Sequence, residues 1–192
     1  MKVLAVSDEE SGLLWNGGIR EAARDVELII SCGDLRREYL EYILTMTNLP
    51  LLYVPGNHDS EGPEGGICID GDVRRICGLA VMGLGGSMRY RQGRNMYSES
   101  EMNMRYQKLR LKVWFCGGIN ILVTHAPARG FGDMEDAAHR GFEVFGKIMR
   151  KYRPQFMLHG HVHRSYGRFR REILHPSGTR VINACGYHIF SV

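Results

Sequence analysis

The sequence that decides the fold of this chain is LHGHVH, residues 158–163. It closes a short apolar run, residues 156–158, and places His161 and His163 two positions apart. Side chains at i and i+2 of an extended segment point to the same side, so the two imidazoles can face a shared metal centre. This pair alone is weak support for a metal site, and its meaning depends on similar endings elsewhere in the chain.

Length and composition indicate an ordinary globular protein. The chain has 192 residues, of which 44% are hydrophobic and 24% charged, and we expect a single domain over residues 1–192. The net charge of +4 is too small to indicate nucleic-acid or membrane binding. The first ten residues, MKVLAVSDEE, resemble neither a signal peptide nor a membrane span, which predicts a cytoplasmic protein.

The cysteines do not form metal-binding pairs in the sequence. There are five, none of them in a CxxC motif: Cys32, Cys68, Cys77, Cys116 and Cys185. An odd number without close pairs favours reduced, buried thiols over a disulfide framework. For the same reason we do not expect any cysteine to bind a metal.

The order of apolar runs predicts an α/β domain. Four further runs have the length of strands: residues 3–6, 28–31, 51–54 and 119–124. Apolar residues at helical spacing predict helices over 36–46, 99–112 and 137–151. Ser98 followed by Glu101 has the form of a capping box and predicts the start of the second helix.

An oxygen or imidazole donor follows each of the five strand-like runs. These donors are Asp8, Glu10, Asp34, Asn57, His58, His125, His161 and His163. Ligand-bearing loops in α/β sheets lie outside the carboxyl ends of the strands. A single Asp after a strand is more often a helix cap or a turn former than a ligand. Five such endings in one chain are hard to explain by structural roles alone, so the sequence predicts a metal site.

The motifs resemble those of the calcineurin-like metallophosphoesterases, which are Asp-x-His, Gly-Asp, Gly-Asn-His-Asp/Glu, a lone His and Gly-His-x-His. Here they read DEE (8–10), GD (33–34), GNHD (56–59), His125 and GHVH (160–163), in the same order. The resemblance implies an α/β fold of two mixed β-sheets packed as a sandwich with flanking helices, in four layers. It also implies an enzyme that hydrolyses a phosphate monoester or diester through a hydroxide that bridges two metals.

The resemblance also implies roles for single residues. Two divalent ions are expected, Mn²⁺ or Fe in the first place, with Zn²⁺ or Mg²⁺ as alternatives. The first ion would be held by Asp8, Glu10 and His163. Asp34 would bridge the ions, and the second would also be held by Asn57, His125 and His161. The expected catalytic residues are His58 and Asp59. His58 would protonate the leaving oxygen, and Asp59 would orient the imidazole of His58.

Glu10 stands where the family usually has His. Asp8 and Glu10 are at i and i+2, so in an extended segment both carboxylates reach the same side. Two divalent ions (+4) with Asp8, Glu10 and Asp34 (−3) leave +1, where a His would leave +2. We therefore expect the first site to favour a harder ion such as Mn²⁺ over Zn²⁺. The alternative is that Glu10 makes only a hydrogen bond near a weakly held ion.

Substrate and partners are less constrained. Arg89 and His139 are candidate substrate contacts. The alternative for Arg89 is a place in a solvated loop, and the alternative for His139 is a surface or capping role. We expect a phosphorylated small molecule or nucleotide-like substrate, since no basic stripe with aromatic residues favours nucleic acid. His159 is expected to be a core histidine bonded to backbone. The competing function is a non-catalytic protein-binding scaffold of the same fold, which would have no need of His58. Oligomeric state stays open.

Overall fold

The computed structural model describes residues 1–167 and 169–192. The first sheet contains β1 (Lys2–Ser7), β2 (Val26–Ser31), β3 (Leu51–Tyr53), β4 (Ile67–Cys68) and β13 (Gly186–Ser191). The second contains β5 (Asp72–Ile76), β6 (Leu79–Leu84), β9 (Ile121–Thr124), β10 (Phe156–His159), β11 (Glu172–Leu174) and β12 (Arg180–Asn183). A small ribbon pairs β7 (Ser87–Met88) with β8 (Met96–Tyr97). The helical segments are η1 (Leu14–Gly18), α1 (Ile19–Ala22), α2 (Arg37–Thr47), α3 (Glu99–Phe115), α4 (Glu143–Tyr152) and η2 (Arg164–Tyr166).

Both sheets are mixed, and the strands that carry candidate ligands are parallel to their neighbours. The first sheet has the order β13-β1-β2-β3-β4, in which only β13 is antiparallel to its neighbour. The second has the order β11-β12-β10-β9-β6-β5, with antiparallel strands at its two edges. Parallel strands end at the same edge of a sheet, so the loops after β1, β2 and β3 gather there, as do those after β9 and β10.

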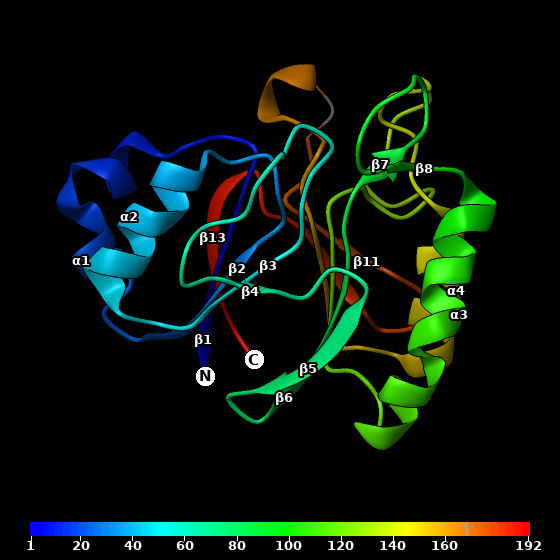
Figure 1. Ribbon diagram of the computed structural model, residues 1–192, viewed down its shortest axis with the longest axis horizontal. Coiled ribbons are helices and arrows are strands. Elements are labelled where there is room, and N and C mark those ends of the chain that lie inside the picture. The colour runs from blue at the N-terminus through cyan, green and yellow to red at the C-terminus, as the bar shows by residue number, and fades with distance from the viewer. Residues whose placement is uncertain (168) are drawn as a thin grey trace.

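The two sheets pack face to face, with α1 and α2 outside one and α3 and α4 outside the other (Figure 1). In β1, Val3 and Ala5 belong to the core between the sheets, whereas Leu4 and Val6 face α1 and α2. Burial on both faces explains why these strands read as continuous apolar runs. The predicted four-layer sandwich of two mixed sheets is confirmed. In the part of the chain that the structure describes, no helix is both long and apolar enough to cross a membrane.

Two of the predicted helices are confirmed as α2 and α3, and the capping box of Ser98 and Glu101 begins α3. The helix predicted over 137–151 begins later, at Glu143. Phe142 N–H donates to the Pro127 carbonyl (3.1 Å), so this segment pairs with the loop after β9 instead of coiling. A Cβ on Gly141 would lie 2.6 Å from a backbone atom of Ala128, a close approach that only glycine allows.

Candidate metal centre

Three candidate ligands lie at sharp backbone turns within three residues of the ends of their strands. The dihedral angle φ is 59° at Asp8, 55° at Asp34 and 68° at His161. This left-handed conformation costs energy for residues with a side chain and persists where the surroundings hold it, often at functional sites. The Gly33 carbonyl accepts from both Asp8 N–H (3.1 Å) and the Ser7 hydroxyl (3.0 Å), which ties two of these loops together. Side chains alternate between the two faces of a sheet only in extended backbone, so this alternation no longer holds at these three ligands.

Four candidate ligand atoms converge around His125, which is buried. Its Nε2 lies 3.1 Å from Asn57 Oδ1 and 3.3 Å from Asp34 Oδ2. The same nitrogen lies 3.1 Å from His161 Nδ1. Atoms that share one ion at about 2.0–2.2 Å are about 3.0–3.6 Å apart, depending on the coordination geometry. The structure thus brings the whole predicted second-site group together with spacings that fit a divalent ion.

Backbone carbonyls determine which nitrogens of the two imidazoles are free. His125 Nδ1–H donates to the Cys32 carbonyl at 2.8 Å, and His161 Nε2–H donates to the Ala138 carbonyl at 2.7 Å. A neutral imidazole with one N–H keeps its lone pair on the other nitrogen. The two lone pairs therefore face each other, an arrangement that needs a cation or a proton between them.

Without a metal, a proton on His125 meets this need. Burial lowers the pKa of His125, but the nearby carboxylate of Asp34 outweighs it and raises the pKa to about 9. Burial likewise raises the pKa of Asp34, yet the charge of His125 and hydrogen bonds bring it down to about 2. Burial and the charge on His125 lower the pKa of His161 to about 3. Without a metal, the ligand group around His125 therefore contains one cation, the protonated imidazole of His125, in place of a divalent ion.

Asp8 and His163 come together on the neighbouring side. Both Asp8 carboxylate oxygens accept from His161 N–H, at 3.0 and 2.9 Å. His163 Nε2 lies 3.7 Å from Asp8 Oδ1. Burial raises the pKa of Asp8, and the charge of Asp34 acts in the same direction. A Cβ on Gly160 would lie 2.2 Å from Asp8 Oδ2, so glycine is needed for the carboxylate to occupy this position.

Glu10 does not join Asp8 and His163. Its carboxylate accepts two hydrogen bonds of 2.6 Å from Arg36 and one of 2.6 Å from Trp15 Nε1. These bonds, the Arg36 bond first, lower the pKa of Glu10 despite partial burial. The expectation that Glu10 lies on the same side as Asp8 is wrong, because Asp8 is in the left-handed conformation and the segment is not extended there.

His58 lies exposed at the rim of the centre. Its backbone N–H donates to Asp34 Oδ1 (2.8 Å), and His58 lines a cavity of about 420 Å³ together with Asp34, Arg36 and Arg37. Asp59 was expected to orient His58, but its hydrogen bonds go elsewhere. Its Oδ2 accepts from the backbone N–H groups of Asp34 (2.9 Å) and Gly56 (2.8 Å), so it shapes the turn that presents Asp34. Burial raises the pKa of Asp59.

The two candidate substrate contacts differ. Arg89 is bound by Glu101 (2.8 and 2.9 Å), the capping residue of α3, and this ion pair gives it a structural role. His139 lies near the centre, with its ring 5.2 Å from the ring of His161 and Nδ1 2.9 Å from Asp136 Oδ1. The structure therefore places His139 beside the candidate metal centre, while Arg89 pairs with Glu101 at the start of α3.

Sequence reasoning missed two side chains beside His163. Donor atoms of Glu9, His163 and Cys185 all lie within 4.8 Å of one another. Cys185 follows β12 and forms a β-bridge with Ser7, which places it next to the end of β1. Cys185 follows an apolar run of strand length, and this position could have identified it as a candidate ligand. The direction of Glu9 was not readable, because it depends on the turn at Asp8.

Comparison with known proteins identifies the family of the chain. The calcineurin-like phosphoesterase superfamily domain matches residues 1–186, and the chain belongs to this superfamily. A stretch of 70 residues is 31% identical to the UPF0046 protein T07D4.2 of Caenorhabditis elegans, covering 35% of this chain and only 16% of that protein.

Two solved structures have the same fold. TT1561 of Thermus thermophilus is 14% identical with a TM-score of 0.66, over 96% of this chain and 89% of that one. The NAD nucleotidase NadN of Haemophilus influenzae is 15% identical with a TM-score of 0.54, over 100% of this chain and 53% of that one. The predicted family resemblance is confirmed by the superfamily match, and these structures support the fold.

Proposed function

We propose that this chain is an enzyme that hydrolyses a phosphate monoester or diester with the help of two divalent metal ions. The observation that carries the proposal is the pair of imidazole lone pairs, on His125 and His161, that face each other at 3.1 Å beside Asp34 and Asn57. Backbone carbonyls hold both rings in this orientation. A group of this kind is arranged for a cation.

The ligands divide between two ions. The second ion is assigned to Asn57, His125 and His161, and the first to Asp8 and His163. Asp34 would be the carboxylate that the two ions share. Oxygen and imidazole donors suit Mn²⁺ or Fe, and also accept Zn²⁺ or Mg²⁺. Because Glu10 is held by Arg36, the charge argument that favoured Mn²⁺ over Zn²⁺ at the first site no longer applies.

The protein's own groups then act on the substrate. Two divalent ions supply positive charge that polarises the phosphoryl group and makes an attacking water more acidic. His58, exposed at the rim and tied through its backbone to Asp34, donates a proton to the leaving oxygen. The adjoining cavity of about 420 Å³ has the size of a small-molecule site and takes the leaving group of a phosphorylated small molecule or nucleotide.

A substrate screen tests this function. The metal-free chain is reloaded with Mn²⁺, Fe²⁺, Zn²⁺ or Mg²⁺ and assayed with aryl phosphate monoesters and diesters. We expect turnover with at least one ion, and its loss in Asp34→Asn. Asp25→Asn is the matched control, because Asp25 is exposed and pairs only with Lys2 at 2.8 Å in the described part of the chain. Absence of turnover in a chain that binds two ions would contradict the proposal.

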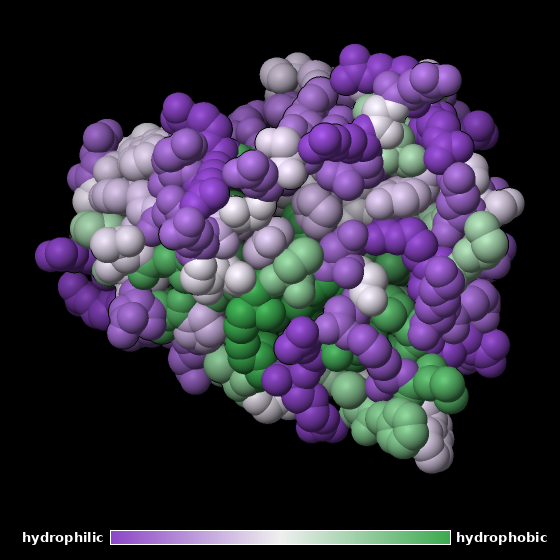
Figure 2. All heavy atoms as spheres, in the orientation of Figure 1, coloured by the Kyte–Doolittle hydropathy of each residue, from purple (hydrophilic) through white to green (hydrophobic). Residues whose placement is uncertain are grey.

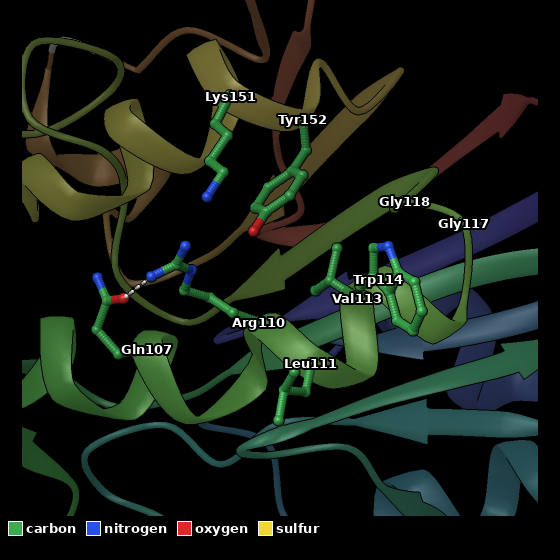
Figure 3. A pocket seen from close by; sticks show the side chains of 9 residues that line it. All are labelled: Gln107, Arg110, Leu111, Val113, Trp114, Gly117, Gly118, Lys151 and Tyr152. Atoms are coloured by element: carbon green, nitrogen blue, oxygen red, sulfur yellow. Dashed lines mark hydrogen bonds between the residues drawn. The ribbon is translucent and has the colours of Figure 1, made fainter.

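One surface favours the scaffold as a second candidate. Near the lower end of α3, Figure 2 shows apolar side chains at the molecular surface, and the exposed fractions are 72% for Leu111, 73% for Trp114 and 78% for Phe115. Leu111 and Trp114 also line a cavity of about 680 Å³ between α3 and the end of α4 (Figure 3). Large exposed apolar residues mark protein-binding surfaces. A chain without turnover whose partner binding is lost on Trp114→Ser would support this function instead.

A further inference from the structure

A second group of metal-binding side chains lies beside the proposed centre. It consists of Glu9, His163 and Cys185, whose donor atoms lie within 4.8 Å of one another. Glu9 Oε1 and His163 Nδ1 are 3.5 Å apart, close to the roughly 3.4 Å between two ligands of one tetrahedral ion. A carboxylate, an imidazole and a thiol differ in chemistry from the oxygen and imidazole donors of the phosphoesterase centre.

Three separate loops build this group. Cys185 follows β12 and bridges to Ser7 at the end of β1, and its N–H donates to Asn183 Oδ1 at 2.9 Å. Glu9 comes directly after the left-handed turn at Asp8, and His163 directly precedes η2. The side chains of Glu9 and His163 are 39% and 33% exposed, so an ion can reach the buried thiol from solvent.

His163 offers a different nitrogen to each site. Its Nε2 is directed toward Asp8 (3.7 Å), whereas its Nδ1 is directed toward Glu9 (3.5 Å). A neutral imidazole has one lone pair, so it binds an ion through one nitrogen at a time. The group around Glu9 is thus distinct from the first phosphoesterase site, and the two sites alternate in using His163.

Two positively charged side chains lie beside Cys185, so a bound cation has to be neutralised by its own ligands. Arg164 and Arg171 donate to the Cys185 carbonyl at 2.9 and 3.1 Å and place positive charge beside the site. A divalent ion is neutralised there by the Glu9 carboxylate together with the Cys185 thiolate, whose proton leaves to solvent on binding. Thiolate ligands favour ions of the Zn²⁺ and Co²⁺ class over Mg²⁺ and Mn²⁺.

We propose that Glu9, His163 and Cys185 form a binding site for a thiophilic divalent ion, Zn²⁺ in chemical class, which competes with the first phosphoesterase ion for His163. This site revises the expectation from the sequence that no cysteine binds a metal. It does not depend on turnover of a phosphoester, because its three donors are in place whether or not the neighbouring centre is active.

Cobalt binding tests the site directly. The full metal-free chain is titrated with Co²⁺, and its absorption spectrum is recorded at each step. We expect the near-ultraviolet charge-transfer band of a cobalt–thiolate bond, because the proposed phosphoesterase ligands include no sulfur. The band should disappear in Cys185→Ser and persist in Cys116→Ser, the control at a partly exposed cysteine that ends α3. Glu9→Gln should keep the thiol but weaken Co²⁺ binding at least about tenfold.

X-ray absorption of the zinc-loaded wild-type chain gives a readout that needs no variant. A sulfur neighbour at about 2.3 Å is expected. The proposal is overturned if neither the cobalt band nor the sulfur neighbour is found, or if the band survives Cys185→Ser. Turnover of phosphoesters without a thiolate band would leave the proposed function intact and reject this site alone.

Discussion

At the scale of single residues, the ion pair between Glu10 and Arg36 separates this chain from the family pattern. Both carboxylate oxygens of Glu10 are taken by Arg36 and Trp15. We therefore expect Glu10→Gln to bind as many ions per chain as the wild type, while His161→Ala binds one fewer. Metal analysis after dialysis measures both. An ion lost from Glu10→Gln would show that the carboxylate leaves Arg36 for the metal.

His58 allows a second test at this scale. Its side chain is exposed and the hydrogen bond to Asp34 comes from its backbone N–H, so His58→Ala should leave metal content and melting temperature unchanged. Removal of a general acid lowers the rate by about 10²- to 10⁴-fold. The loss should be largest for alkyl esters, whose leaving oxygens need a proton, and smaller for nitrophenyl esters.

His188→Ala is the matched control for His58→Ala, because it removes a partly exposed imidazole from β13, outside the centre. Equal losses for alkyl and nitrophenyl esters would argue against proton donation by His58. A loss of bound metal in His58→Ala would instead indicate a role in the ligand group.

At the scale of elements, the junction between the ends of β1 and β10 positions Asp8, a ligand of the proposed first site. A Cβ added to Gly160 would lie 2.0 Å from Ser7 Oγ and 2.2 Å from Asp8 Oδ2. Gly160→Ala should therefore lower the free energy of unfolding by about 1–3 kcal/mol through overpacking and weaken metal binding as Asp8 moves. Urea unfolding and metal titration measure the two effects.

Gly12 provides the control for Gly160. No atom of the described residues lies within 4 Å of a Cβ built there, so Gly12→Ala should change the free energy of unfolding by less than about 0.5 kcal/mol. If Gly160→Ala were equally neutral, the ends of β1 and β10 would have to separate freely, and the close approach would not position Asp8.

At the scale of the whole molecule, buried histidines make stability depend on pH. Burial lowers the pKa of His159 from 6.5 to about 4 in the folded chain, where its Nδ1–H donates to the Gly160 carbonyl at 3.0 Å. Below pH 6.5 the unfolded chain takes up a proton that the folded chain refuses. Stability should thus fall between pH 6.5 and 4 by about 3 kcal/mol in all. Urea unfolding of the metal-free protein across this range measures the slope.

His159→Gln, which keeps a donor for the carbonyl, should show a shallower decline of stability with acid. An unchanged slope would assign the effect to other groups, of which His161 has the same sign. His125 has the opposite sign. The pKa of His125 is raised to about 9, so its contribution is present below pH 6.5 and is lost as the pH rises through 9.

Much of this molecule follows from its sequence. The apolar runs that become β1, β2, β3, β9 and β10 are buried on both faces, and the donor after each run could be read directly. The family motifs placed His125, His161 and Asn57 in one ligand group, and in the structure Asn57 Oδ1 and His161 Nδ1 each lie 3.1 Å from His125 Nε2. His159 is buried and bonded to backbone, as expected.

The direction of individual side chains could not be read from the sequence. Alternation along a strand predicts direction only while φ stays negative and extended, and Asp8 and His161 break it with φ of 59° and 68°. After the turn at Asp8, the Glu10 carboxylate pairs with Arg36 and the Glu9 carboxylate lies 3.5 Å from His163 Nδ1.

The sequence by itself determined the fold and the residue types at one edge of the sheets, because burial and hydrogen-bonding demands act locally along each strand. Only the tertiary structure decided which of Glu9 and Glu10 approaches the centre, and that Cys185 lies beside it. Those outcomes depend on contacts between loops far apart in the chain, such as the bridge from Cys185 to Ser7. Around LHGHVH, therefore, the sequence specified the donors and the packing of the loops specified their partners.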